Sequence, residues 1–375
     1  GQVGATNIIA FAICAPFVAR LVDRFGQARV MIPLVTVSAT SLLGLIVAAA
    51  MHAPVVYLYV FTTVSGATSG SLGSMVRSRW TVAVKNPAQL HTAFSMEATL
   101  DEVVFMIGPI LATILSANVN PVAGMVLALI LAVSGGFWLL SQRATEPPIS
   151  TSSIHGPKGS VMAQPVMIAL ALVYVGAGAM FGSIDISVVA FTESMGQKAM
   201  AGILLGVFAF GSMLAGLLYG ARSTSIPLWK LFVGGVFLLA VGVSLTYFAR
   251  TIIGLGIILF FTGFSISPTM INVTAMVQKA VPPRRLTEGL TWMSTAMNVG
   301  SSLGSALAGR VVDHSGHVGG FHTAIGFAWV MVTISLIAIP ALRATSHKKR
   351  AQIPVQVRSR RMGLGGLWKR RPRKI

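Results

Sequence analysis

Charged residues are scarce in this chain. Only 10% of its 375 residues are Asp, Glu, Lys or Arg, and the mean hydropathy is +0.79. Globular proteins in water carry roughly 25% charged residues. With so little charge, polar groups cannot cover the surface of the folded chain, so part of its apolar surface must face lipid. The composition therefore excludes an ordinary soluble domain and predicts an integral membrane protein.

Residues that carry catalytic chemistry are also few. The one cysteine, Cys14, lies in an apolar run and cannot form a disulfide within the chain. The sequence lacks the Gly-x-x-x-x-Gly-Lys-Ser/Thr loop of nucleotide hydrolases and the His-Glu-x-x-His metal motif. We therefore predict no metal, no cofactor and no enzymatic activity. A polytopic membrane enzyme, a channel and a non-transporting membrane protein remain the alternatives.

Long apolar runs make up most of the chain. They are continuous, as in membrane helices, whereas the strands of a membrane barrel alternate polar and apolar residues. The fold class expected is all-α and integral to the membrane, with about eleven spans. These spans are Gly1–Ala19, Val30–Ala50, Val55–Val76, Phe94–Ala117, Pro121–Leu140, Val166–Phe191, Ala201–Tyr219, Leu231–Phe248, Ile252–Val277, Glu288–Val312 and Phe321–Leu342.

Basic residues predict how the spans are oriented. One set of connections holds Arg20, Arg24, Arg29, Arg77, Arg79, Lys85, Arg143, Lys158, Arg222, Lys230, Lys279, Arg284 and Arg285, and the basic tail lies on the same side. The opposite connections hold only Lys198, Arg250 and Arg310. Because cytoplasmic loops are enriched in Lys and Arg, we place the basic side and the C-terminus in the cytoplasm of a multi-pass cell-membrane protein.

The connection after the first span carries a recognisable motif. Its sequence, Ala19-Arg20-Leu21-Val22-Asp23-Arg24-Phe25-Gly26-Gln27-Ala28-Arg29, resembles the major facilitator superfamily motif Gly-x-Leu-x-Asp-Arg-x-Gly-Arg-Arg/Lys. Leu21, Asp23, Arg24 and Gly26 match it. Ala19 replaces the first glycine, and Gln27-Ala28 replaces the basic pair, with Arg29 one place late.

The resemblance implies a two-half helical bundle in which about 11 of about 12 family helices are visible. The first membrane helix would be missing. We expect an upstream span to supply it, and a true deletion of that helix is the alternative. The expected parts are 1–140 as the N-terminal half, 141–165 as a cytoplasmic loop, 166–342 as the C-terminal half and 343–375 as a basic cytoplasmic tail. The implied function is secondary transport of small molecules by alternating access, as proton-coupled efflux.

The resemblance also implies roles for the motif residues. Asp23, Arg24, Gly26 and Arg29 would form a cytoplasmic gate, in which Asp23 faces the start of a helix in the other half. In this chain that helix follows Pro282-Pro283, and Thr287 is a candidate N-cap. The alternative is a connection whose charges simply stay in water.

Gly108 and Pro109 partly resemble the Gly-Pro-x-x-Gly motif of the family's drug antiporters, although Ala112 replaces the later glycine. This match favours antiport. The alternative is plain helix packing, because small residues let helices approach each other closely.

Only nine residues are acidic, so acids within the spans are informative. Asp185 is the first candidate for proton or substrate coupling, and Gly178 and Gly182 predict that a neighbouring helix approaches there. Asp101, Glu102 and Glu97 are the next candidates, with an ion-pair cluster around Arg77 and Arg79 as the alternative. Asn272 and Asn298 fit either substrate contacts or hydrogen bonds between helices.

The net charge of +19 arises largely from the tail, with clusters such as Lys348-Lys349-Arg350. Next to a membrane helix, such a segment is attracted to anionic lipid by roughly 1 kcal/mol per Lys or Arg. We therefore expect anionic lipid, not nucleic acid, as its partner; a tail that only fixes the topology is the alternative. The sequence does not identify the transported molecule.

Overall fold

The computed structural model describes residues 2–148, 160–221 and 226–347. Lys158, Arg222 and the basic clusters of the tail lie outside the described residues. The described chain consists of helices and their connections, without strands, which confirms the predicted all-α class. The α-helices are α1 (Gln2–Phe25), α2 (Gln27–Ala50), α3 (Val55–Ser69), α4 (Leu72–Ala83), α5 (Pro87–Asn118), α6 (Ala123–Ser141), α7 (Pro165–Ser194), α8 (Met200–Gly220), α9 (Leu228–Leu245), α10 (Ile252–Gly263), α11 (Ile266–Ala280), α12 (Leu286–Ile337) and α13 (Ile339–His347).

The helices follow the predicted apolar runs but divide them differently. The third run is split into α3 and α4, and the ninth into α10 and α11. The last two runs are joined in α12, which is broken at Gly316, where φ is 65° and ψ is −167°. Glycine adopts such a conformation without a steric penalty. By length and composition, seven helical stretches of the described chain could cross a membrane.

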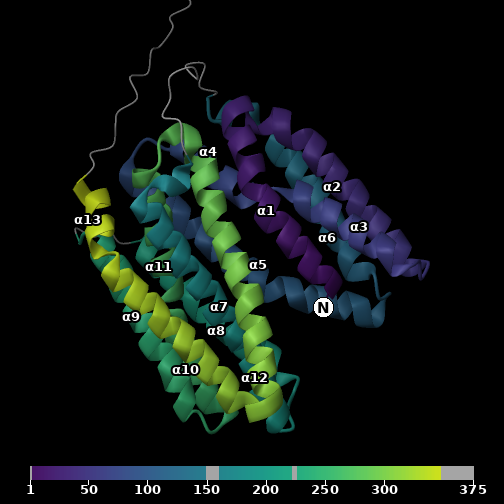
Figure 1. Cartoon of the computed structure of the whole chain (residues 1–375), viewed down its shortest axis with the longest axis vertical. Coiled ribbons are helices and arrows are strands. Elements are labelled where there is room, and N and C mark those ends of the chain that lie inside the picture. Colours follow the sequence, from purple (N-terminus) through teal and green to yellow (C-terminus); the bar gives the residue numbers. More distant parts are fainter. Residues whose placement is uncertain (1, 149–159, 222–225, 348–375) are drawn as a thin grey trace, which may run out of the picture.

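The helices form two groups that lie side by side (Figure 1). One contains α1, α2, α3 and α6, and the other contains α7 to α13. Contacts of α1 with α12, and of α5 with α8 and α11, join residues from the two ends of the sequence. These contacts position the candidate functional site.

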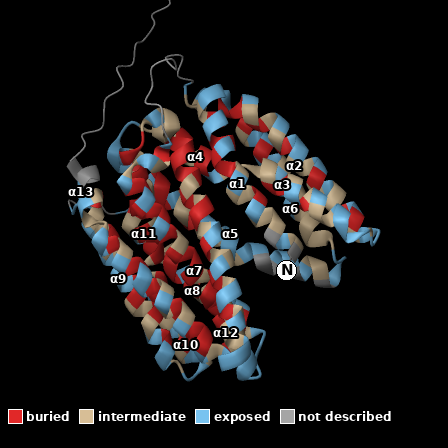
Figure 2. Ribbon diagram, in the orientation of Figure 1, coloured by how far each residue is buried: buried red, intermediate tan, exposed pale blue. Residues whose placement is uncertain are grey.

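Burial differs strongly between the two groups (Figure 2). The largest apolar core lies among α7 to α13, and α7 is its central helix, with 78% of its most apolar stretch buried. The corresponding stretch of α6 is only 11% buried. An apolar helix that is so exposed needs lipid around it, which explains how a charge-poor chain keeps an apolar exterior.

Helices α7 and α12 pack backbone against backbone. A Cβ atom added at Gly178 or Gly182 would collide with backbone carbonyl oxygens of α12, and one added at Gly300 or Gly304 would collide with those of α7. Ser183 Oγ also donates a hydrogen bond to the Gly304 carbonyl oxygen at 3.2 Å. The close approach that the two glycines of α7 predict is therefore confirmed, and it fixes the helix that carries Asp185.

Candidate functional site

The two helical groups meet through polar side chains where α1 ends and α12 begins. We call this side of the bundle the basic end, because Arg20, Arg24 and Arg285 lie there. Asp23 Oδ2, near the end of α1, accepts a hydrogen bond of 2.9 Å from the backbone N–H of Glu288. A helix N-terminus has unsatisfied N–H groups and a partial positive charge, so a carboxylate is well matched to it.

The side chain of Glu288 completes this contact. It is fully buried, and Arg20 of α1 binds its Oε1 through Nη2 at 2.9 Å and through Nε at 3.3 Å. Arg285, just before α12, binds the same carboxylate through Nε at 2.9 Å and Nη2 at 2.8 Å. Two arginines therefore neutralise one buried acid, and the Arg20 bond joins the two helical groups. We call Arg20, Asp23, Arg285 and Glu288 the α1–α12 lock.

The structure places Asp23 at the start of the helix that the sequence analysis expected, and its role as a gate stays a prediction. The prediction that Thr287 is the N-cap of this helix is wrong. Helix α12 already begins at Leu286 after a 3₁₀ turn, so Thr287 lies inside its first turn. No side chain of α12 caps its own start; Asp23 of α1 supplies the acceptor from the other group.

The other motif residues have different surroundings. Gly26 has a φ of 95° and separates α1 from α2, which explains the need for glycine at this turn. Arg24 and Arg29 are exposed, and within the described chain neither joins the lock. Gln27 is 2% exposed. The structure thus brings only Asp23 of the four predicted gate residues into the contact between the groups.

Gln27 belongs to a second buried network at the basic end. Its Oε1 accepts a bond of 2.6 Å from Arg79 Nε, and Arg79 Nη1 donates to the Gln142 carbonyl oxygen at 2.7 Å. The backbone N–H of Ala28 donates to Glu146 Oε1 at 3.1 Å. The residues that depart from the family motif therefore attach the start of α2 to the connection that follows α6.

A second polar contact joins α5 to α8, a helix of the α7–α13 group. His91 Nε2 lies 3.2 Å from the Tyr219 carbonyl oxygen, and Thr92 Oγ1 donates to the Gly220 carbonyl oxygen at 3.2 Å. Tyr219 in turn donates its hydroxyl hydrogen to Asn272 Oδ1 at 2.8 Å. Buried Asn272 therefore makes a hydrogen bond between helices, one of its two expected roles.

The acidic candidates of α5 have different partners. Arg77 pairs with Glu97 at 3.3 Å and also with Asp101, which is the predicted ion-pair cluster without Arg79. Glu102 lies outside it and accepts a bond of 2.6 Å from Ser212 of α8. Each of the three acids of α5 is thus already engaged in a polar contact.

Asp185 differs from these acids. Its side chain is exposed, and among the described residues it forms no ion pair or hydrogen bond. It lies well within α7, beside the close contact of that helix with α12. Its role in proton or substrate coupling stays a prediction.

Gly108 is exposed, and a Cβ atom added to it would meet no other atom within 4 Å among the described residues. The side chain of Pro109 is outside the described part. The described residues therefore show no packing role for Gly108, and the antiporter role of the pair stays a prediction.

Sequence reasoning missed Glu288, Arg20 and Arg285 as site residues. It used the arginines only for orientation and took Glu288 as the end of a span. Part of their signal was present, because Glu288 opens an apolar helix directly after two arginines. Arg24 and Arg284 lie at the same two helix ends, so the sequence did not single out Arg20 and Arg285. Pairing across 268 residues of sequence has no local pattern.

The fold and the contacts define a multi-pass helical membrane protein whose two helical groups meet through breakable polar contacts. The family model described as Major Facilitator Superfamily matches residues 1–198 and again residues 166–373. The chain belongs to this superfamily. No curated protein matched the sequence.

Solved transporter structures have the same fold. The human organic anion transporter MFSD10 (TETRAN) superposes with a TM-score of 0.68 at 16% identity, covering 89% of this chain and 82% of that one. A bacterial homologue of the iron transporter ferroportin, in its outward-facing state, gives a TM-score of 0.69 at 14% identity and covers 92% and 89%. At these identities the likeness establishes the fold, and the membrane-transporter class follows from the family.

Proposed function

We propose that this protein is a secondary active transporter that moves small molecules across the cell membrane by alternating access. In this proposal it exports its substrate in exchange for protons and does no chemistry on it. The halves 1–140 and 166–342, linked by 141–165, move relative to each other. The basic end and the C-terminus face the cytoplasm.

The α1–α12 lock is the observation that carries this proposal. It joins the two helical groups through charged groups, of which Arg20 is 47% exposed on its side chain and so remains close to water. Glu288 is fully buried but its partner Arg20 can turn to water, so we put the contact between the groups at about 1–2 kcal/mol. A contact of that strength closes one end of the bundle and can reopen when a ligand or proton shifts the balance by a few kcal/mol.

Asp185 is the proposed coupling acid. A carboxylate inside a membrane helix costs about 2.5–3.5 kcal/mol on insertion scales, and such residues mark ion or proton paths. Asp101, Glu97 and Glu102 are weaker candidates, because their carboxylates already bind Arg77 or Ser212. Gly108 and Pro109 support the efflux direction only through their likeness to the antiporter motif.

Transport can be tested without knowing the substrate. Cells that express the full chain, its Asp23→Asn variant or its Asp185→Asn variant are compared by untargeted mass spectrometry of cytosol and medium, with and without a protonophore. We expect at least one compound to leave cells faster with the parent chain, and the protonophore to remove the difference. Equal membrane levels of the three proteins serve as the control.

The same measurement separates transport from enzymatic activity. Transport moves a compound from cytosol to medium and conserves its total amount, whereas an enzyme changes the total and yields a product. A parent profile that matches both variants and cells without the protein would overturn the proposed function.

A further inference from the structure

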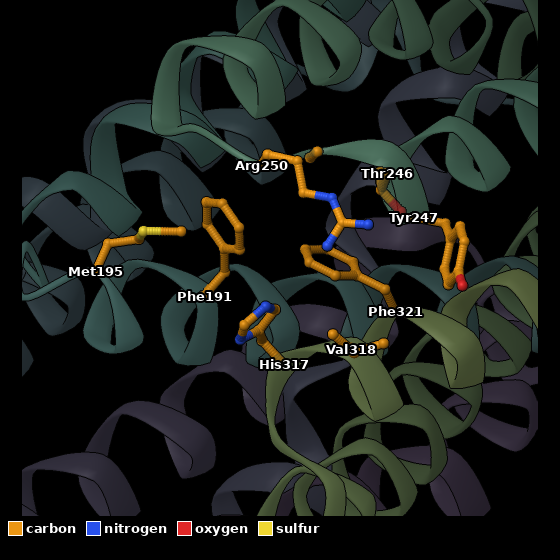
Figure 3. Close-up of a pocket in the computed structure, with 9 residues that line it drawn as sticks. Phe191, Met195, Thr246, Tyr247, Arg250, His317, Val318 and Phe321 are labelled. Carbon is orange, nitrogen blue, oxygen red and sulfur yellow. The ribbon is translucent and has the colours of Figure 1, made fainter.

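A pocket of about 240 Å³ lies at the end of α7, and none of its lining residues belongs to the lock. It forms where α7 ends, where the link from α9 to α10 passes and where α12 resumes after Gly316. Phe191, Thr246, Tyr247, Arg250, His317 and Phe321 line it (Figure 3). It shares no residue with the lock, with the acids of α5 or with Asp185.

Arg250 gives the pocket its charge. Its side chain reaches toward Phe321 and Tyr247 in Figure 3. No ion pair of Arg250 exists among the described residues, whereas the neighbouring Lys198 binds Glu193 at 3.0 Å. A guanidinium offers several N–H donors in one plane, and this one has no carboxylate to receive them.

The backbone around Arg250 is well fixed. The N–H of Ala249 donates to the Thr246 carbonyl oxygen at 3.1 Å, and Thr251 caps α10 by accepting a bond of 3.1 Å from Gly254. Arg250 therefore sits in a short connection anchored on both sides. This anchoring places the root of its side chain at a constant position on the pocket wall.

The pocket also has a buried aromatic floor, and the Arg250 side chain lies over one of its rings, that of Phe321 (Figure 3). Phe191 and Phe321 are 1% and 2% exposed, and their ring centres lie 6.2 Å apart. The ring of His317 meets Phe191 edge-on at 5.1 Å, and its Nδ1 lies 3.2 Å from Ser194 Oγ. Arg250 itself is exposed, so these apolar residues reduce the screening of its charge by water on one side only.

These features select the chemistry of a ligand. Arginine binds carboxylate and phosphate through paired N–H bonds, and aromatic rings bind an apolar body. The volume is below the roughly 300–1,000 Å³ of sites for drug-sized ligands, so the occupant is small or only its head enters. We propose that the pocket binds an amphipathic anion, with its carboxylate or phosphate on Arg250 and its apolar part against Tyr247 and Val318, which line the pocket and are 47% and 42% exposed.

The ligand can come from two sources. It is either a free organic acid in water or the phosphate head of an anionic lipid, because Tyr247, Phe248 and Ile253 expose apolar surface beside the pocket. Tyrosine and other aromatic residues gather at the boundary of membrane and water. Both sources share the acidic head and the adjoining apolar body.

Binding of free acids is measured by calorimetry on the purified full chain in a zwitterionic detergent. The probes are 3-phenylpropionate and benzyl phosphate, with benzyl alcohol as the uncharged control. We expect Arg250→Gln to weaken probe binding about tenfold or more, as expected for loss of charge-assisted hydrogen bonds. The matched control is Arg310→Gln, which removes an exposed charge outside the pocket and changes binding less than about twofold.

Lipid binding is measured by native mass spectrometry of the same proteins released from micelles that contain phosphatidylglycerol or phosphatidylcholine. If the occupant is a lipid head, the parent and Arg310→Gln retain one phosphatidylglycerol more than Arg250→Gln does. If it is a free acid, retention is equal, and only the soluble probes distinguish the variants.

Val318→Trp gives a second test that leaves the charge in place. Val318 lines the pocket and is 42% exposed, so a larger side chain fills the space without disturbing a buried core. We expect it to abolish binding of whichever ligand the parent retains, and it replaces Arg250→Gln if that variant does not fold. The proposal fails if no probe binds up to about 10 mM and no lipid is retained. It also fails if the pocket variants bind as the parent does.

Discussion

Replacing Glu288 with Gln tests the α1–α12 lock most directly. The substitution keeps the size of the side chain but removes the negative charge that Arg20 and Arg285 share. Arg285 belongs to the same helical group as Glu288, so losing the ion pair between these two residues changes local stability only. The Arg20 bond crosses between the groups, and its loss shifts the balance between a closed and an open basic end.

The magnitude follows from burial. Removing one partner of a fully buried pair costs about 3–5 kcal/mol. Here Glu288 has no exposed surface, but the side chains of Arg20 and Arg285 are 47% and 20% exposed and can turn to water. We therefore expect the closed arrangement to lose about 1–2 kcal/mol, a factor of about 5–30 in the equilibrium constant.

Electron spin resonance measures this shift as a distance distribution between two labels. Exposed Arg29 and Lys279, at the starts and ends of helices near the basic end, are replaced by labelled cysteines after Cys14→Ser. We expect Glu288→Gln to increase the population of the longer distance.

The matched control is Glu193→Gln, which breaks an exposed pair with Lys198 inside one helical group. It leaves the distribution unchanged if the reasoning is correct. Double substitution of Arg20 and Glu288 then separates their mutual interaction from the effect of each change alone. An unchanged distribution in Glu288→Gln would refute the view that this contact holds the two groups together.

Four further predictions follow from the same geometry. Asp23→Asn weakens the contact with the start of α12 by about 0.3–1 kcal/mol and lowers export at an unchanged membrane level, whereas unchanged export leaves the connection with a topological role only. Asp185→Asn abolishes proton-driven export but spares exchange down the substrate gradient, and normal uphill pumping in vesicles would exclude it as the coupling acid. Gly300→Val overlaps the backbone of α7 and destabilises the protein by at least about 1–3 kcal/mol, seen as a lower thermal transition, while Gly108→Ala is tolerated. A C-terminal tag stays inaccessible to an impermeant reagent in intact cells, and labelling of the tag from outside would contradict the predicted orientation.

The helical architecture was largely predictable, because long apolar runs are a local signal. The positions at which the helices break were less predictable. Gly70 and Ser265 divide runs that hydropathy treats as continuous. The polar residues 313–317 did predict the separation of the last two runs, and the structure places that break at Gly316.

The site was predictable only where a motif marked it. The family motif pointed to Asp23 and to the start of the helix that it faces. It did not reveal Glu288, because a buried acid between two arginines is defined by tertiary contact. It also did not reveal that Gln27 would bind Arg79, since the two residues lie on different helices and neither belongs to a local pattern.

The interlocking glycines of α7 and α12 hold the two helices together as one stiff unit. From Glu288 to the middle of the contact, and from there to Gly316, α12 extends for similar lengths of about 21 Å each at 1.5 Å per residue. Backbones packed this tightly cannot slide past each other without overlap, so the two helices tilt together as one stiff beam. A displacement of this beam at Glu288 is therefore carried along α12 towards Gly316. Asp185 and Phe191 lie on α7 beside that part of α12, so a movement at the lock also moves them.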